Sequence, residues 1–529
     1  DQGIERKNNI VHLDAKSLTQ HTFVTGSTGC GKSNTIYYLI KQIRNQLNAP
    51  KFLVIEPAKG EYKDIFGNEH IYGTNPLKTP LLKINPFCFP EGVHVLEHID
   101  RLVEIFNVCW PMYAAMPAVL KESIENAYKS AGWDLDLSIN EKVDQLYPTF
   151  DDVLRELDKT INSSDYSADT KGDYIGSLST RIKSLTNGIN GRVFVSNEML
   201  LEDLFDKSAI IDISRVGAME TKALIMGIVV MKLQEYRMAY SSEMNSDLKH
   251  VTVLEEAHNL LKKTSSEQST DSSNLVGKSV EMLTNAIAEI RTYGEGFVIV
   301  DQAPNLLDTA AIRNTNTKIV LRLPEKTDRE ITGGSMALKD SQFDELSKLP
   351  TGIATIYQND WQEAILCKVN KFKNYEDIFT KSDISIPAVT KLKKENDRLL
   401  HILLNKSTTV EPKKIKDYIL KSNVAAKVKK DLITNLGVRN IDFEWAIADF
   451  IKKNYDLSDV FRGTQNENWS DLSELSGIMI SNLQAEFLDF NSAEMQAILY
   501  YVCRIEHELY PEHSLIEKLR VEYLREKVI

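Results

Sequence analysis

The chain has 529 residues, which is too long for one hydrophobic core and predicts roughly two or three domains. Hydrophobic residues make up 42% of it and charged residues 26%, a balance that excludes a disordered or fibrous protein and predicts a soluble globular one. The net charge of −12 excludes a general nucleic-acid coat, although locally basic loops would be enough to line a DNA channel.

Cysteine usage and hydropathy indicate the compartment. The five cysteines are scattered and include no Cys-x-x-Cys pair: Cys30, Cys88, Cys109, Cys367 and Cys503. This odd set disfavours a disulfide framework or a zinc site and favours the reducing cytoplasm. The sequence has no secretory signal and no apolar run of about 18 residues, so no membrane insertion is expected.

The segment from Gly26 to Ser33 matches the phosphate-binding pattern G-x-x-x-x-G-K-[ST]. Its glycines allow a tight turn that brings backbone N–H groups onto phosphate oxygens. Lys32 begins a helical pattern and can reach the β- and γ-phosphates of ATP, and Ser33 offers a hydroxyl to Mg²⁺. The predicted nucleotide-binding residues are Gly26, Ser27, Thr28, Gly29, Cys30, Gly31, Lys32, Ser33 and Asn34. A Gly/Ser turn that matches by chance is the alternative, but the order of strand, loop and helix favours a nucleoside triphosphate site.

Short apolar runs alternate with helical patterns from residue 22 to residue 370. The runs are residues 23–24, 52–55, 209–213, 251–254, 297–300, 319–321 and 353–357. Near-continuous apolar runs separated by helices predict an α/β fold with a mainly parallel sheet buried on both faces. The last pair, around Asn359 and Asp360, predicts a hairpin at an antiparallel edge.

Two regions lack this alternation. Helical spacing replaces the strand signal between residues 94 and 190, which predicts a helical insertion whose Trp110, Tyr113 and Trp133 are core aromatics. Beyond residue 370, Lys-rich and Glu-rich helices predict a docking or oligomerisation domain, with a DNA-reading helix-turn-helix as the alternative. The predicted domains are residues 1–93 and 191–370 for the two parts of the core, 94–190 for the insertion and 371–529 for the C-terminal helical domain.

A second motif places acidic residues at the end of an apolar run. Residues 251–254 are followed by Glu255, Glu256, Ala257 and His258. Because open α/β sheets bind ligands at the carboxyl ends of their strands, both carboxylates are expected beside the nucleotide. We assign Glu255 to Mg²⁺ and Glu256 to the attacking water, which it would orient and deprotonate. The alternative is that both acids lie on a solvated helix start; His258 is interpreted as a structural or signalling residue.

With these motifs, the chain resembles the HerA branch of the HerA/FtsK ring ATPases, which are RecA-like DNA translocases. The motifs that match, in the family's order, are Leu18 with His21, then residues 59–62, 255–258, 289–294, 301–304 and 316–322. The resemblance extends over roughly residues 10 to 370, with little specificity inside the predicted insertion.

The resemblance implies roles for three further residues. Gln302 would be a polar sensor that contacts the γ-phosphate or the attacking water. Arg291 would be an arginine finger that reaches the nucleotide of a neighbouring subunit, and Arg322 is the second candidate for that role. An arginine suits the charge that spreads over a transferred phosphoryl group, and such fingers contribute about 10³–10⁵ in rate. Either arginine could instead form a structural salt bridge.

The sequence departs from the family pattern in two places. The family's acidic strand commonly ends in Asp-Glu, whereas this one ends in Glu255 and Glu256, so the extra methylene is expected to alter Mg²⁺ geometry. The small N-terminal β-barrel of the family does not fit into the segment before Gly26. We therefore expect such a barrel to precede Asp1 or to be supplied elsewhere.

The resemblance also implies partners: a homohexameric ring, DNA in its central pore, and a nuclease or NAD-hydrolysing effector in DNA end processing or phage defence. The alternatives are an ATP-regulated ring scaffold that controls an effector, and a conjugative-transfer ATPase. Two basic patches are candidates for sequence-independent contacts with DNA phosphates, although a solvated charged face is the ordinary explanation for each residue. They are Lys171, Arg181, Lys183 and Arg192, and then Lys262, Lys263 and Lys278.

Overall fold

The computed structural model describes residues 9–46, 49–241, 243–263, 275–373, 387–405, 410–438, 440–461, 470–509 and 514–525. The sequence has a polar, Ser-rich tract at residues 264–273, which lies outside these ranges. The chain divides into two compact units. The first comprises residues 1–122, 187–193 and 198–384, and the second comprises residues 123–186, 194–197 and 385–529.

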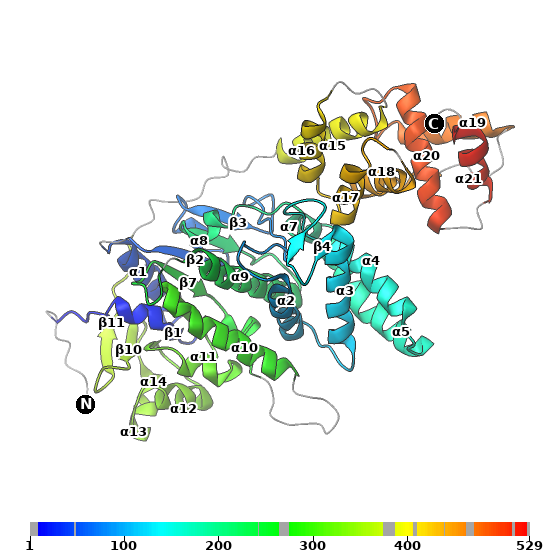
Figure 1. Ribbon diagram of the computed structural model, residues 1–529. Coiled ribbons are helices and arrows are strands. Elements are labelled where there is room, and N and C mark those ends of the chain that lie inside the picture. Colours follow the sequence, from blue (N-terminus) through cyan, green and yellow to red (C-terminus); the bar gives the residue numbers. More distant parts are fainter. Residues whose placement is uncertain are drawn as a thin grey trace. The chain divides into compact units, whose positions relative to one another are not determined.

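In the described part of the first unit, nine strands form one sheet in the order β11-β10-β9-β1-β8-β7-β2-β6-β3 (Figure 1). The strands are β1 (Thr22–Thr25), β2 (Lys51–Glu56), β3 (His70–Gly73), β6 (Ala209–Asp212), β7 (His250–Leu254), β8 (Glu295–Asp301), β9 (Thr317–Val320), β10 (Ile353–Gln358) and β11 (Ile365–Lys368). Every pairing from β9 to β3 is parallel, and β10 runs antiparallel to both of its neighbours. The predicted α/β fold, its mainly parallel sheet and its antiparallel hairpin are therefore confirmed.

Strand β3 has no counterpart among the predicted apolar runs. It forms an edge of the sheet, and its residues alternate between half-buried and buried. The central strands β1, β6, β7 and β8 are buried at every residue instead. A strand that is covered on one face does not need a continuous apolar run, which explains why the sequence pattern does not reveal β3.

Helices cover the sheet and fix the strand ends. Helix α1 (Lys32–Arg44) places Ile36 and Ile40 in one core with Val54 and Val253 of the sheet. Helices α2 (Val95–Cys109), α9 (Met219–Tyr240) and α10 (Leu275–Glu289) form a layer in which α2 packs against both others (Figure 1). At Gly227 of α9, an added Cβ would lie 2.7 Å from Ile105 Cγ2 of α2, so a glycine is required for this close approach.

The other helices of the first unit are short and lie between strands. They are α7 (Asn190–Val193), α8 (Glu202–Phe205), α11 (Thr309–Arg313), α12 (Lys326–Gly334), α13 (Asp340–Phe343) and α14 (Glu345–Lys348). Single helical turns at strand ends are η1 (Lys16–Gln20), η2 (Tyr62–Asp64), η4 (Ala257–Asn259), η5 (Ile290–Tyr293) and η6 (Pro304–Leu306). Each of these five turns carries at least one residue of the motifs described above.

The predicted insertion at residues 94–190 does not form a unit of its own. Helix α2 belongs to the first unit, and α3 (Met116–Ala131) begins in the first unit and ends in the second. The remainder lies in the second unit: the hairpin β4 (Trp133–Asp134) and β5 (Ile139–Asn140), then α4 (Phe150–Ser163), α5 (Ala168–Tyr174), η3 (Ile175–Ser179) and α6 (Thr180–Thr186). The boundary predicted at residue 94 therefore differs from the packing, because α2 is part of the helical layer on the sheet.

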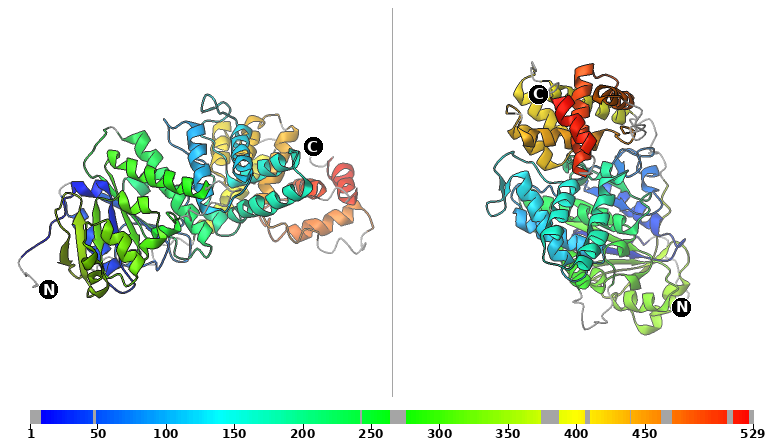
Figure 2. Two further views of the ribbon diagram at one scale, coloured as in Figure 1. Left: turned by 90° about the horizontal axis from the view of Figure 1, so that it is seen from below. Right: turned by 90° about the vertical axis from the view of Figure 1, so that its right-hand side faces the viewer.

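The second unit joins this segment to the C-terminal helices, coloured from yellow to red in Figures 1 and 2. These are α15 (Pro387–Leu404), α16 (Pro412–Lys421), α17 (Ala426–Thr434), α18 (Ile441–Asn454), α19 (Leu472–Leu483), α20 (Ser492–Leu509), α21 (Ser514–Lys518) and η9 (Leu519–Leu524). Asp152 at the start of α4 accepts hydrogen bonds from the backbone N–H groups of Ala426 (2.8 Å) and Lys427 (3.0 Å). An acidic residue is thus placed at the positive end of α17.

Two of the three predicted core aromatics are buried. Trp110 stacks on Phe106, and Trp133 donates its indole N–H to the carbonyl of Leu146. The prediction for Tyr113 is wrong, because this residue lies between α2 and α3 and 54% of its surface is exposed. Among the described helices, none combines the length and the apolar character needed to cross a membrane.

Candidate nucleotide site

The phosphate-binding loop connects the end of β1 to the start of α1 at Lys32. Gly29 (φ +77°) and Gly31 (φ +106°) are left-handed, a conformation that favours glycine. At Gly26 the reason is space, because an added Cβ would lie 2.6 Å from Cys30 Sγ and 2.8 Å from Leu321 Cβ. The predicted motif therefore forms a tight turn that leads directly into the N-terminus of a helix, as phosphate binding requires.

Two neighbouring loops hold this turn in place. The N–H of Ser27 donates to the carbonyl of Arg322 (2.9 Å), and the N–H of Gly352 donates to the carbonyl of Cys30 (2.9 Å). The Ser27 N–H is therefore already used within the protein. Cys30 is fully buried, and burial raises the pKa of its thiol. Of the residues predicted to bind nucleotide, Ser27 thus holds the loop by its backbone hydrogen bond, and Cys30 holds it by its buried side chain.

The structure brings Gln302 to the phosphate loop. Gln302 follows the last residue of β8, and its Oε1 accepts a hydrogen bond from Thr28 Oγ1 (3.1 Å). Strands β1 and β8 are adjacent and parallel, with Thr25 beside Asp301, so their carboxyl ends meet at the same edge of the sheet. This register places the predicted sensor within reach of a phosphate bound by the loop.

Glu255 lies at the end of β7, buried and in contact with a residue that received no role from the sequence. Its Oε1 accepts a hydrogen bond of 2.5 Å from the hydroxyl of Tyr62 in η2. Burial raises the pKa of Glu255, against the opposing effects of the Tyr62 hydrogen bond and the charge of Lys32. Tyr62 therefore holds the carboxylate that the sequence assigns to the metal, and Lys32 is close enough to act on it electrostatically.

Glu256 has an unusual backbone and a free carboxylate oxygen. Its φ of +47° is uncommon for a non-glycine residue, and strained residues of this kind gather at functional sites. The Oε2 atom is buried and has no hydrogen-bond partner in the described structure. It lies 3.6 Å from His258 Nδ1. An acceptor of this kind suits an attacking water, the role that the sequence assigns to Glu256.

Asp301 at the end of β8 fixes His258. The carboxylate oxygen Oδ2 accepts from the backbone N–H of His258 (2.8 Å) and contacts the ring Nδ1 (2.9 Å). The hydrogen bond that the His258 ring donates to the Asp301 carboxylate raises the pKa of His258. The ligand atoms of Glu256, His258 and Asp301 all lie within 4.8 Å of one another. The sequence motif at residues 301–304 contains Asp301 but assigns it no role, although a carboxylate at the end of an apolar run is a usable sign of a site residue.

The loop after β2 is the second feature that sequence reasoning left without a role. Glu56 accepts hydrogen bonds from the N–H groups of Glu61 (2.7 Å) and Tyr62 (3.2 Å). Burial raises the pKa of Glu56 to about 8. Lys59 Nζ lies 3.4 Å from Ser33 Oγ, the hydroxyl predicted to bind Mg²⁺. The Lys-Gly-Glu-Tyr motif at residues 59–62 therefore belongs to the site.

Asn34 differs from its prediction. Its side-chain amide donates to the carbonyl of Asn370 (3.0 Å) and accepts from the N–H of Phe372 (2.8 Å). Both polar groups of the side chain are thus used to attach α1 to the segment after β11. The Asn34 side chain faces this segment and not the phosphate loop.

The two candidate finger arginines lie at opposite ends of the parallel strands, Arg322 after the carboxyl end of β9 and Arg291 before the amino end of β8. Arg322 follows β9 and is half-buried beside its own phosphate loop, where its carbonyl accepts from Ser27. Arg291 is exposed in η5, immediately before β8. Burial lowers the pKa of His21, at the start of β1, to about 4, and the charge of Arg291 adds to this effect. The phosphate loop follows the carboxyl end of β1. Because β1 and β8 are parallel, the start of β8 lies at the opposite, amino end of these strands.

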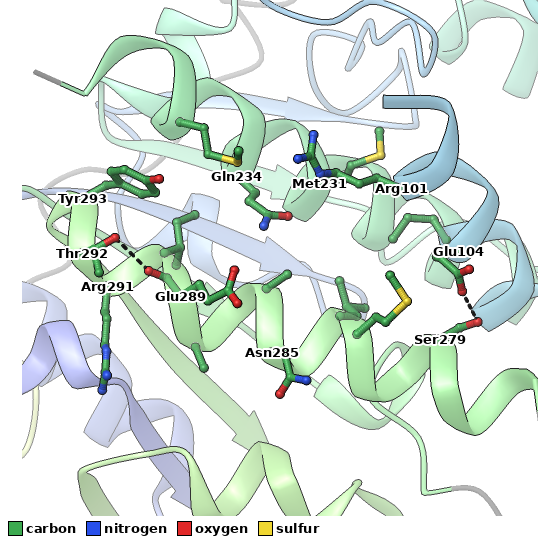
Figure 3. Close-up of a pocket in the computed structure, with 17 residues that line it drawn as sticks. Arg101, Glu104, Met231, Gln234, Ser279, Asn285, Glu289, Arg291, Thr292 and Tyr293 are labelled. Atoms are coloured by element: carbon green, nitrogen blue, oxygen red, sulfur yellow. Dashed lines mark hydrogen bonds between the residues drawn. The ribbon is translucent and has the colours of Figure 1, made fainter. Parts of the chain in front are cut away.

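Arg291 also lines a cavity of about 690 Å³ between α2, α9 and α10. Figure 3 shows its side chain extending away from the other labelled side chains that line this cavity. An exposed arginine in this position is too far along the sheet to serve the phosphate loop of its own chain.

Comparison with known proteins agrees with this geometry. A family model described as the central domain of the helicase HerA matches residues 4–233. A probable helicase of Methanocaldococcus jannaschii is 25% identical over 391 residues, 69% of either chain. The DNA double-strand break repair helicase HerA of Sulfurisphaera tokodaii is 22% identical over 368 residues, 69% of this chain and 67% of the relative. These matches show similarity to the HerA helicases and support a P-loop ATPase of the HerA/FtsK type.

A solved structure agrees with this ATPase at the level of the fold. VirB4 of Thermoanaerobacter pseudethanolicus has a TM-score of 0.51 at 18% identity and covers 67% of this chain and 90% of its own. The family match includes the phosphate loop and the Lys-Gly-Glu-Tyr motif but ends within α9. Glu255, Glu256 and Gln302 lie beyond the residues that this family model matches.

The first predicted basic patch is divided between the two units, and the second lies within one unit. Lys171, Arg181 and Lys183 belong to the second unit, whereas Arg192 belongs to the first. Lys171 Nζ donates to the carbonyl of Asn162 (2.8 Å). The second patch lies within the first unit, where Lys262, Lys263 and Lys278 are all exposed on either side of residues 264–274.

Proposed function

We propose that this ATPase is a Mg²⁺-dependent DNA translocase of the HerA type that works as a homohexameric ring. One observation carries the proposal. Glu255 and Gln302 lie at the same sheet edge as the phosphate loop, whereas Arg291 lies exposed at the opposite edge. The carboxylates and the arginine of one subunit therefore lie at opposite ends of the strands. The nucleotide site is complete only when a second subunit supplies its Arg291.

The residues at the loop fit ATP and Mg²⁺. The ammonium of Lys32 and the helix N-terminus would bind the phosphates, and the hydroxyl of Ser33 with the carboxylate of Glu255 offers the oxygen ligands that Mg²⁺ prefers. The bound ion would neutralise charge on the β- and γ-phosphates. The unpartnered Oε2 of Glu256 would accept the proton of the attacking water, and Gln302 would orient that water or the γ-phosphate.

DNA and an effector protein are the proposed partners of the ring. Lys262, Lys263 and Lys278 would contact DNA phosphates in the pore without reading bases. The helical second unit would dock a nuclease or NAD-hydrolysing effector, in the cytoplasm, for DNA end processing or phage defence. The relatives named as HerA helicases support the DNA-handling part of this proposal.

The test is ATP hydrolysis by the Lys32→Ala variant, with and without duplex DNA. We expect wild-type protein to hydrolyse ATP, DNA to stimulate hydrolysis with a strong salt dependence, and the variant to be inactive. Lys51→Ala is the matched control, because Lys51 is exposed at the other end of the sheet. Unchanged hydrolysis by Lys32→Ala contradicts the site. Hydrolysis that DNA does not stimulate favours a ring scaffold, for which ATP is mainly an assembly ligand.

A further inference from the structure

The loop between β2 and η2 is held in one conformation from several sides. The carboxylate of Glu56 ties down the N–H groups of Glu61 and Tyr62. Lys63 Nζ donates to Asp212 Oδ2 (2.7 Å) and to the carbonyl of Gly60. Gly60 has φ +74°, and an added Cβ would lie 2.9 Å from Ser214 Oγ, so only glycine fits. The backbone that carries Lys59 is therefore fixed before any ligand binds.

Lys59 itself has a strained backbone and an unpaired charge. Its φ is +66°, which costs a non-glycine residue about 1–3 kcal/mol and is found most often at functional sites. The side chain is exposed, and no carboxylate of the described residues lies within ion-pair distance of its Nζ. Lys63, four residues further on, is paired with Asp212 instead. Lys59 thus keeps its cation available, in contrast to its neighbour.

The position of this cation identifies its target. Nζ lies 3.4 Å from Ser33 Oγ and acts electrostatically on Glu255. Lys59 lies in the loop after β2, and strands β8 and β7 separate β2 from β1, which leads into the phosphate loop. It therefore reaches the loop from the side of the acidic pair. Glu255 and Glu256, which would hold Mg²⁺ and the attacking water beside the terminal phosphate of bound ATP, lie on this side.

We propose that Lys59 is a second phosphate-binding lysine, which contacts the terminal phosphate of ATP opposite Lys32. This inference deepens the proposed function and rests on its nucleotide site. The charges favour it: Glu255 and Glu256 are adjacent carboxyls, and an ATP phosphate that approaches them needs more positive charge than Lys32 alone provides. Because ADP lacks this terminal phosphate, the Lys59 contact would strengthen the binding of ATP and not that of ADP.

The contrary possibility is that the Lys59 ammonium only fills the metal position and leaves when Mg²⁺ and nucleotide arrive. The two ideas predict opposite signs. A terminal-phosphate contact means that loss of the charge weakens ATP binding. A placeholder would compete with the metal, so that loss of its charge would leave ATP affinity unchanged or increase it.

The experiment is calorimetric titration of Lys59→Gln and Lys59→Arg with ADP and with the slowly hydrolysed analogue ATPγS, in the presence of Mg²⁺. We expect Lys59→Gln to bind ATPγS about 10-fold more weakly than wild type, the cost of one charge-assisted hydrogen bond, and to bind ADP unchanged. Lys59→Arg keeps the charge and should retain most of the affinity. Lys51→Gln is the matched control, since it removes an exposed lysine from the start of β2, the strand that leads into the Lys59 loop.

Three outcomes separate this inference from the nucleotide site itself. Equal ATPγS affinity of Lys59→Gln and wild type, or tighter binding by the variant, overturns the role of Lys59 while the site stands. Equal weakening of ADP and ATPγS overturns the contact with the terminal phosphate. Failure of wild type to bind ATPγS, or normal binding by Lys32→Ala, overturns the proposed site, whatever Lys59→Gln does. Matching thermal unfolding curves show that the Lys59 variants are folded.

Discussion

At the scale of single residues, the contact between Tyr62 and Glu255 bears on the departure from the family pattern. A glutamate in place of the usual aspartate has an additional rotatable bond, and its carboxylate is less fixed. Here the Tyr62 hydroxyl donates to Glu255 Oε1 at 2.5 Å, and both residues are buried. The hydrogen bond therefore supplies the orientation that the longer side chain loses, and in the proposed site it would leave Oε2 of Glu255 for Mg²⁺.

Removal of this hydroxyl should impair catalysis through the metal. In Tyr62→Phe we expect kcat for ATP hydrolysis to fall about 10-fold and the half-saturating Mg²⁺ concentration to rise, because a buried carboxylate loses its donor. A Mg²⁺ titration of the steady-state rate measures both. Tyr37→Phe is the control, since Tyr37 lies in the same aromatic cluster but its hydroxyl contacts Glu61. A Mg²⁺ dependence equal to that of wild type would show that Tyr62 does not position Glu255.

At the scale of elements, a buried charge network fixes the start of β8. Glu295 is fully buried and contacts His250 Nδ1 (2.8 Å), Thr252 Oγ1 (2.8 Å) and Arg237 Nε (3.1 Å). Burial alone would raise the pKa of Glu295, but the charges of His250 and Arg237 and the hydrogen bonds lower it to about 2. This network lies at the edge of the sheet where η5 presents Arg291.

This lowered pKa predicts a dependence of stability on pH. Because the pKa of Glu295 is lower in the folded than in the unfolded chain, its stabilising contribution is full above about pH 4.5 and is lost as the pH falls towards about 2. Glu295→Gln should lower the unfolding free energy by about 3 kcal/mol at pH 7, and its difference from wild type should shrink below about pH 4.5. Thermal unfolding midpoints between pH 7 and 3 measure this. Glu281→Gln, an exposed position on α10, should show no such change, and a difference that is constant with pH contradicts the account.

Among the elements, some strands and contacts could be predicted from the sequence and others could not. The buried strands could be predicted because a strand covered on both faces must be apolar throughout, as in residues 297–300. The meeting of Glu255 and Gln302 with the phosphate loop could be predicted because parallel strands align their carboxyl ends. Asn34 and Tyr62 could not, since their partners, Phe372 and Glu255, are set by packing between segments that are distant in the chain.

At the scale of the whole molecule, the division of the chain into two units could not be predicted from a sequence pattern, because it too depends on contacts between distant segments. The contact of Asp152 with the start of α17 joins residues 274 positions apart, and helical spacing gives no sign of it. Conversely, the separation of Arg291 from its own phosphate loop follows from strand direction alone. This separation is the basis of the proposed ring, in which every nucleotide site has residues from two subunits.

The central claim is tested most directly by mixing two inactive variants, Lys32→Ala and Arg291→Ala, during assembly. Each alone should hydrolyse ATP at a small fraction of the wild-type rate, and Arg291→Ala should still bind ATPγS as wild type does. An equal mixture should recover about a quarter of the wild-type rate, because in a randomly mixed head-to-tail ring that share of interfaces combines an intact phosphate loop with an intact arginine. A mixture no more active than its components, or normal hydrolysis by Arg291→Ala alone, would contradict the composite site.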